Sequence, residues 1–227
     1  MVFGVNIYTI PLFLAAFICL GLLLLTVVQQ SRKGAWPMIG LLLAIVIWTI
    51  SYSLMLESSS PQARLQWQNV RFIGPTLATL SVFVFALEYT GRGRYVTRRN
   101  VYLLAVVPVL TNLFVWTNFM GLVRETVTVA QPPGSLVRFR IEWGPWFYVH
   151  AIYSYLLGFG AIALFAEKGL RFGASPAETK RTRMMLLAVL LPLVGSIVHV
   201  AGFTEFDFAP FGFAVSAVML LAAIALY

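Results

Sequence analysis

Long apolar stretches separated by short polar segments dominate the chain. A span of the roughly 30 Å hydrocarbon core of a bilayer takes about 20 helical residues. Seven stretches near that length carry no charged residue, namely 1–31, 34–56, 72–87, 100–123, 143–166, 184–204 and 208–227. The shortest, 72–87, still counts as a span because Arg71 and Glu88 at its ends can extend to the two interfaces. The pattern therefore predicts an all-α membrane protein with a bundle of seven transmembrane helices.

Turn and capping signals set the ends of these helices. A glycine-rich turn lies at 91–94, and Ser175 before Pro176 is expected to cap the helix that follows. Three prolines, Pro75, Pro108 and Pro192, fall inside predicted helices, where each removes one backbone hydrogen bond. The helices are predicted at roughly 6–28, 35–56, 70–90, 101–118, 145–167, 183–202 and 208–227, all within a single domain of residues 1–227.

The loop at 119–144 has strand character instead. Residues 122–129 and 136–143 favour strands, and Pro132, Pro133 and Gly134 separate them. In the second strand, apolar residues alternate with charged ones, as in Phe139 and Ile141 beside Arg140. The pattern predicts an extracellular β-hairpin between helices four and five, whose apolar face packs as a lid on the helix bundle.

Composition and charge support the membrane interpretation and orient the chain. Hydrophobic residues make up 60% and charged residues 11% of the sequence, which is far from the composition of soluble domains. Alternating turns place eleven of the sixteen Lys and Arg residues on one side and five on the other. By the positive-inside rule the richer side is cytoplasmic, so the N-terminus is predicted outside and the C-terminus in the cytoplasm. The net charge of +8 therefore sets topology and can attract anionic membrane lipids, and no nucleic-acid partner is expected.

The sequence offers little catalytic chemistry. Most of the eight carboxylates lie at or beyond the ends of the predicted spans, and neither an H-E-x-x-H nor a G-x-S-x-G motif occurs. The seventh predicted helix contains no lysine for a retinal Schiff base, and the single cysteine, Cys19, excludes an intrachain disulfide. We expect no enzymatic activity of this chain, no cofactor and no metal site.

Polar and aromatic residues gather in the predicted outer half of the bundle. In a first interpretation they form interhelical hydrogen bonds and interfacial anchors. In a second they line a pocket for a small or lipid-like ligand, with the two intramembrane histidines foremost. The candidate ligand-binding residues are Trp48, Tyr52, Asn112, Trp116, His150, Tyr153 and His199, with Ser51, Tyr155 and Ser196 at similar depth.

Several phrases resemble one family, the seven-transmembrane N-terminal sensor region of bacterial and archaeal histidine kinases. They follow the family's order from about residue 40 onward: 48–52 (WTISY), 72–75 (FIGP), 85–91 (FALEYTG), Pro108 with Thr117 and Asn118, 144–147 (GPWF), Tyr153 with Tyr155, 191–192 (LP) and 207–210 (DFAP).

The resemblance implies a sensory input module in the plasma membrane, acting as a homodimer. Family members of this kind carry cytoplasmic PAS, kinase or other output domains, which are absent from this chain, so helix seven is expected to relay the signal to them. A small transporter or channel is the alternative, and the odd helix count without a visible repeat argues mildly against it.

Overall fold

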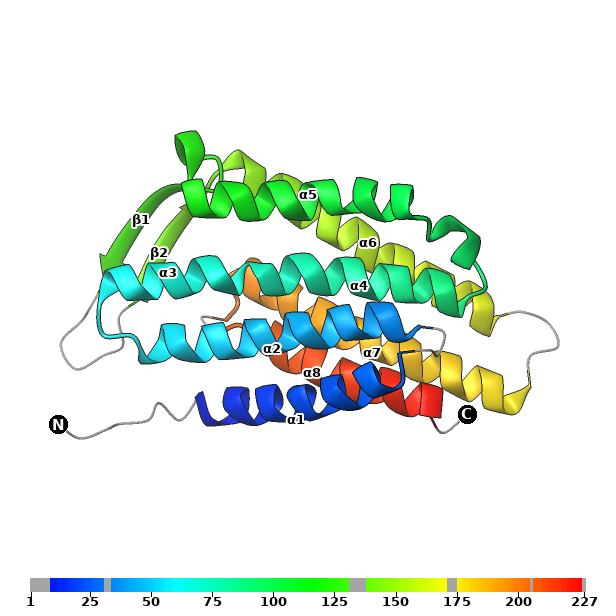
Figure 1. Ribbon diagram of the computed structural model, residues 1–227. Coiled ribbons are helices and arrows are strands. Elements are labelled where there is room, and N and C mark those ends of the chain that lie inside the picture. Colours follow the sequence, from blue (N-terminus) through cyan, green and yellow to red (C-terminus); the bar gives the residue numbers. More distant parts are fainter. Residues whose placement is uncertain (1–8, 31–33, 131–137, 171–174, 205, 226–227) are drawn as a thin grey trace.

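The computed structural model describes residues 9–30, 34–130, 138–170, 175–204 and 206–225, and these form one bundle of helices with a hairpin at one end (Figure 1). Two short 3₁₀ helices, η1 (Gly93–Tyr95) and η2 (Phe119–Gly121), lie in its connections. The α-helices are α1 (Thr9–Val28), α2 (Ala35–Glu57), α3 (Pro61–Arg71), α4 (Ile73–Tyr89), α5 (Arg98–Thr117), α6 (Pro145–Gly169), α7 (Pro176–Val200) and α8 (Ala209–Ala225).

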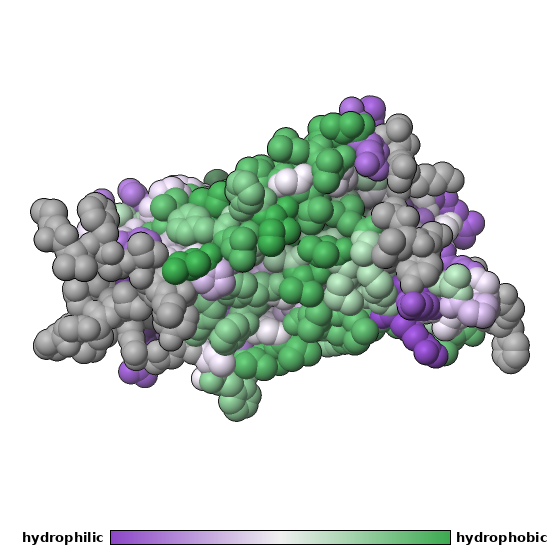
Figure 2. Space-filling view, turned by 90° about the horizontal axis from the view of Figure 1, so that it is seen from below, coloured by the Kyte–Doolittle hydropathy of each residue, from purple (hydrophilic) through white to green (hydrophobic). Residues whose placement is uncertain are grey.

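Most of these helices suit a membrane in length and composition. Within the described ranges six segments are long and apolar enough to cross it: α1, α2, α3 together with α4, α5, α6 and α7. The apolar part of α8, Ala209–Ala222, is shorter. Hydrophobic residues cover the middle of the face drawn in Figure 2, and hydrophilic residues lie toward its two ends. The chain is therefore a multi-pass membrane protein, while the count of seven spans stays a prediction.

Helix α2 lies at the centre of the bundle. It packs against α1, α3, α4 and α8, and 61% of its most apolar window is buried, against 17% for α5. Leu42 and Ile45 of α2 are fully buried in a core that also contains Phe85 of α4 and Phe165 of α6. The outer helices instead present large apolar side chains outward, such as Phe17 and Leu103, as lipid-facing helices do.

Helix α3 was not foreseen. The third helix was predicted to begin near residue 70, but helical structure begins at Pro61, where the Ser60 hydroxyl accepts a hydrogen bond of 3.1 Å from the Ala63 amide. Polarity concealed this helix, because residues 61–71 include five Gln, Asn and Arg side chains besides Arg71. The break at Phe72 between α3 and α4 follows from Pro75, which has no N–H for the Arg71 carbonyl.

Helix α7 also begins earlier than predicted, at Pro176 rather than near residue 183. The predicted cap is confirmed, since the Ser175 hydroxyl accepts a hydrogen bond of 3.2 Å from the Glu178 amide. The first turns of α7 carry Lys180 and Arg181. They therefore lie outside the uncharged stretch from which the start of this helix was predicted.

The predicted hairpin is a two-stranded antiparallel sheet of β1 (Arg124–Ala130) and β2 (Arg138–Trp143). Val127 lies opposite Ile141, and a bulge between Arg124 and Thr126 shifts the register. Ile141 and Trp143 are half-buried while Arg140 and Glu142 are exposed, so the alternation of the second strand appears in the structure. The predicted turn at 132–134 and the Phe139 side chain lie outside the described part.

Arg124 fastens the hairpin to the helices. Its guanidinium donates a hydrogen bond of 2.7 Å to the Asn69 side-chain oxygen on α3, and its backbone N–H and C=O each pair with the Asn118 side chain at 3.1 Å. Burial lowers the pKa of Arg124 to about 10, so the group stays charged at neutral pH. On the other strand Trp143 stacks on Phe147 of α6, with ring centroids 4.1 Å apart.

The chain places its basic residues at opposite ends of the bundle. The hairpin end comprises the α2–α3 turn, the hairpin and the α7–α8 connection, while the α4–α5 connection and the start of α7 lie at the other end (Figure 1). Among described residues, Arg64, Arg71, Arg124, Arg138 and Arg140 belong to the hairpin end, and Arg92, Arg94, Arg98, Arg99, Lys168, Lys180, Arg181 and Arg183 to the opposite end. Which end faces the cytoplasm stays a prediction from charge.

Candidate functional site

A cavity of about 1270 Å³ lies in the hairpin half of the bundle, between α2, α3, α4, β2, α6, α7 and the α7–α8 connection. Helices α6 and α7 each contribute one face, because their lining residues recur every three or four positions. Small residues on the α6 face, such as Ala151 and Gly158, leave space open. The α6 residues are Phe147, His150, Ala151, Ser154, Tyr155 and Gly158, and the α7 residues are Val189, Pro192, Leu193, Ser196, His199 and Val200.

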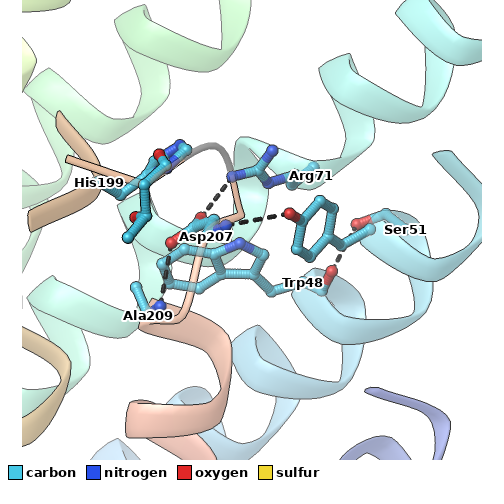
Figure 3. A network of polar contacts seen from close by, with 8 residues as sticks. Trp48, Ser51, Arg71, His199, Asp207 and Ala209 are labelled. Atoms are coloured by element: carbon cyan, nitrogen blue, oxygen red, sulfur yellow. Dashed lines mark hydrogen bonds and ion pairs between the residues drawn. The ribbon is translucent and has the colours of Figure 1, made fainter. Parts of the chain in front are cut away.

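An ion pair between Arg71 and Asp207 forms part of the cavity wall. The Asp207 carboxylate also accepts a hydrogen bond of 3.0 Å from the Ala209 amide, at the first residue of α8. Its own amide donates to the Tyr52 hydroxyl at 3.0 Å, and the Arg71 guanidinium lies 4.3 Å from the Tyr52 ring centroid. Figure 3 shows Arg71 turned toward Asp207, with dashed lines from Asp207 to its partners. Asp207 thus joins α2, α3 and the start of α8.

The α3 residues of the wall were missed by sequence reasoning. Arg64, Gln68 and Arg71 line the cavity, and their spacing of four and three residues puts them on one helical face. The sequence signal was available: Ser60 and Pro61 are a helix start, and polar residues at helical spacing follow. Arg71 was instead taken as an interfacial anchor, and Asp207 as lying beyond the spans.

Four predicted ligand-binding residues line the cavity: Trp48, Tyr52, His150 and His199, together with Tyr155 and Ser196. The Trp48 ring packs on Gly74 of α4, where an added Cβ would lie 2.5 Å from Trp48 Cβ. His199 Nδ1 is 3.1 Å from the Thr204 carbonyl oxygen. A carbonyl only accepts, so Nδ1 carries the proton. In the neutral ring, Nε2 is then the hydrogen-bond acceptor.

The other three candidates lie away from the cavity lining. Asn112 donates 2.9 Å hydrogen bonds to Thr76 of α4 and to the Pro108 carbonyl in its own helix. Trp116 is 53% exposed on α5. Tyr153 donates a 2.5 Å hydrogen bond to the Leu104 carbonyl of α5. Ser51 donates to carbonyls of its own helix at 2.6 and 3.1 Å.

The role of Tyr153 follows from Pro108. A proline leaves the carbonyl four residues earlier without its helical donor, and for Pro108 that carbonyl belongs to Leu104, the acceptor of the Tyr153 hydroxyl. The same relation recurs at Pro192, whose orphaned carbonyl is that of Ala188. Ser216 of α8 donates its hydroxyl to the Ala188 carbonyl. Neighbouring helices thus satisfy both carbonyls, as membrane bundles require.

In the described part of the chain, no three His, Cys, Asp or Glu side chains group closely enough to hold a metal ion. The cavity at the hairpin end has a mainly apolar wall with a few polar groups, an arrangement that suits ligand binding.

Comparison with known proteins identifies the family. No curated protein matches the chain at a significant level. The family model for the N-terminal 7TM region of histidine kinase matches residues 11–227. Because this match covers nearly the whole chain, the protein belongs to the family of N-terminal 7TM regions of histidine kinases.

Proposed function

We propose that this region is a sensory input domain in the plasma membrane, which binds its signal in the hairpin-end cavity and relays occupancy through α8. The family match supports an input role over a transporter or channel. It concerns the membrane region of such kinases and not their kinase domain, so we assign no catalysis to these residues.

The Arg71–Asp207 pair is the observation that carries the proposal. Both residues line the cavity, and the same carboxylate holds the first amide of α8. A ligand that displaces or reorients the wall at this point changes the start of α8. Helix α8 then runs from the hairpin end to the opposite end of the bundle (Figure 1), so a shift or rotation at its start reaches the far end.

The contact between α7 and α8, here called the α7–α8 seam, is tightly packed and would guide this motion. Gly212 packs so closely that an added Cβ would lie 2.7 Å from Pro192 Cα, and Ser216 bonds to the Ala188 carbonyl. Pro192, Leu193 and Ser196 of α7 line the cavity as well. A ligand in the cavity would therefore contact α7, the helix against which α8 packs.

The experiment fuses residues 1–227 to the cytoplasmic kinase part of a characterised histidine kinase and measures autophosphorylation in membranes. Asp207→Asn removes the charge and keeps an oxygen for the Ala209 amide. We expect it to change basal output at least threefold and to blunt the response to extracts that stimulate the wild type.

The matched control is Glu142→Gln, the same acid-to-amide change on the exposed face of the hairpin, where Glu142 accepts only a 2.6 Å hydrogen bond from Thr126 among its described contacts. It should leave output unchanged. Since breaking one partner of a buried ion pair costs about 3–5 kcal/mol, the double variant Arg71→Gln/Asp207→Asn serves as a folded, uncharged version. Wild-type output from this double variant would refute the relay.

A further inference from the structure

We infer that the cavity's ligand is a neutral, mainly apolar molecule that carries hydrogen-bond-accepting oxygens, such as a carbonyl or an ester. This inference rests on the proposed function, because it names the chemical class that the same cavity selects. Three observations carry it: the unpaired polar atoms in the wall, the pairing of the charged wall residues, and the donor chemistry of the unpaired atoms.

Several unpaired buried polar atoms lie in the cavity wall. Within the described residues, four lining side chains have a buried polar atom without a hydrogen-bond partner: Trp48 Nε1, His150 Nδ1, Ser154 Oγ and Thr204 Oγ1. Trp48 and His150 are only 4% and 6% exposed. Buried polar groups are normally paired, so these atoms call for an occupant that supplies partners.

The charged groups in the buried part of the wall are already engaged. Arg71 and Asp207 pair with each other, Arg64 has an interaction of its own, and Arg140 is exposed. The atoms that await a partner are all on neutral or neutralisable side chains. An ionised ligand group at the depth of Trp48 and His150 would lose its hydration without meeting a counter-charge there. These conditions favour a neutral ligand.

The unpaired atoms also define two contact points on the ligand. An indole N–H donates and never accepts, so Trp48 requires an acceptor oxygen. His150 and Ser154 lie one helical turn apart on α6, and either can donate to a second oxygen. The wall also contains many apolar residues, among them Phe72, Val82, Phe147, Leu193 and Phe213. A mainly apolar molecule with two acceptor oxygens matches this wall.

The test uses three probes with one carbon chain: methyl oleate, oleate ionised at pH 8, and octadecene, which has no oxygen. Binding of tritiated methyl oleate to the purified full chain in detergent is measured, with the other two as competitors. We expect saturable binding of the ester, with oleate and octadecene competing at least tenfold more weakly. Tighter competition by oleate would overturn the inference, as would equal competition by all three, or no saturable binding.

The variants separate the wall from general partition into an apolar protein. Trp48→Phe should weaken binding of methyl oleate at least tenfold, while Trp116→Phe, the same change at an exposed site outside the cavity, should leave the Kd unchanged. Because Trp48 also packs in the core, Ser154→Ala serves as a milder second variant that removes one hydroxyl. It should weaken binding about threefold to tenfold, and equal Kd values in all variants would overturn the proposal.

Two sources share this chemistry, a membrane lipid ester and a lipophilic molecule made elsewhere. Mass spectrometry of molecules that purify with the wild type in excess over Trp48→Phe distinguishes them, since only the first also occurs in the bulk lipid extract. An acidic co-purified ligand would refute the inference and leave the sensory function standing. Ester binding without any effect on the output of the fused kinase would instead refute the sensory function.

Discussion

At the scale of single residues, the hydroxyl of Tyr153 is a structural group. Its acceptor is the Leu104 carbonyl, which Pro108 leaves without a helical donor. The sequence placed Tyr153 beside His150 on a shared helix face, but a helix face is wide, and here His150 lines the cavity while Tyr153 meets α5. Tyr153 thus belongs to the interhelical hydrogen bonds and His150 to the cavity wall, while ligand binding stays a proposal.

This role predicts a background-dependent cost. Tyr153→Phe should lower the free energy of unfolding by about 0.6–1.7 kcal/mol, as for other interhelical hydrogen bonds in membranes. In a Pro108→Ala background the backbone N–H of residue 108 returns to the Leu104 carbonyl, so the same change should cost close to nothing. Thermal unfolding of the four proteins in detergent measures both costs. Equal costs in the two backgrounds would show that the hydroxyl does not serve the orphaned carbonyl.

The candidate site was only partly predictable from sequence, for a physical reason. Counting residues along each helix gives depth, and depth grouped Trp48, Tyr52, His150 and His199, which all line the cavity. Rotation of each helix about its axis decides which side chain faces the cavity, and this depends on packing between helices. Hence Asn112 and Trp116 share the depth but not the wall. The Arg71–Asp207 pair joins residues 136 positions apart. In the sequence each charge looks like an ordinary residue at the end of a span, because no local signal shows that the two side chains meet.

At the scale of elements, apolar length predicts where helices run and fails where a helix is polar. The ranges 35–56 and 145–167 agree with α2 and α6 to within two residues. Helix α3 was missed because its polar side chains are satisfied by the hairpin and by the cavity wall, as in the Asn69–Arg124 contact. The hairpin itself was foreseen, since strand alternation and a proline-glycine break are local signals.

The α7–α8 seam gives a prediction at this scale. Gly212→Ala would place a Cβ 2.7 Å from Pro192 Cα, which is backbone and cannot rotate away. We expect it to force the helices apart and to lower the free energy of unfolding by about 1–3 kcal/mol. In the fused kinase it should also change basal output.

Gly21→Ala on α1 is the matched control, because an added Cβ there meets nothing within 4 Å. This change should be neutral or should stabilise the helix by up to about 1 kcal/mol. The measurement is thermal unfolding in detergent together with autophosphorylation. If Gly212→Ala and Gly21→Ala behave alike, the seam is not tightly packed.

At the scale of the whole molecule, the orientation of the bundle in the membrane is predicted from its charges. The opposite end carries most of the Lys and Arg residues, and the positive-inside rule places it in the cytoplasm. Two exposed positions suit a cysteine-labelling test of this orientation: Ser59 at the hairpin end and Ala177 at the start of α7. The native Cys19 is buried and adds little background.

We expect a membrane-impermeant thiol reagent to label Ser59→Cys on intact cells and Ala177→Cys only after the membrane is opened. The measurement is the labelled fraction of each protein before and after permeabilisation. The reverse pattern would place the cavity on the cytoplasmic side, and the ligand would then have to come from inside the cell.

The central position of α2 has a consequence for biogenesis. Helix α2 is synthesised well before α8, one of the helices it packs against, and Arg71 can meet Asp207 only after that later segment has been made. Until then a nascent chain holds an arginine near the membrane without its carboxylate and a central helix with an uncovered face. We therefore expect versions that stop before Asp207 to be degraded faster in the membrane than versions that include α8.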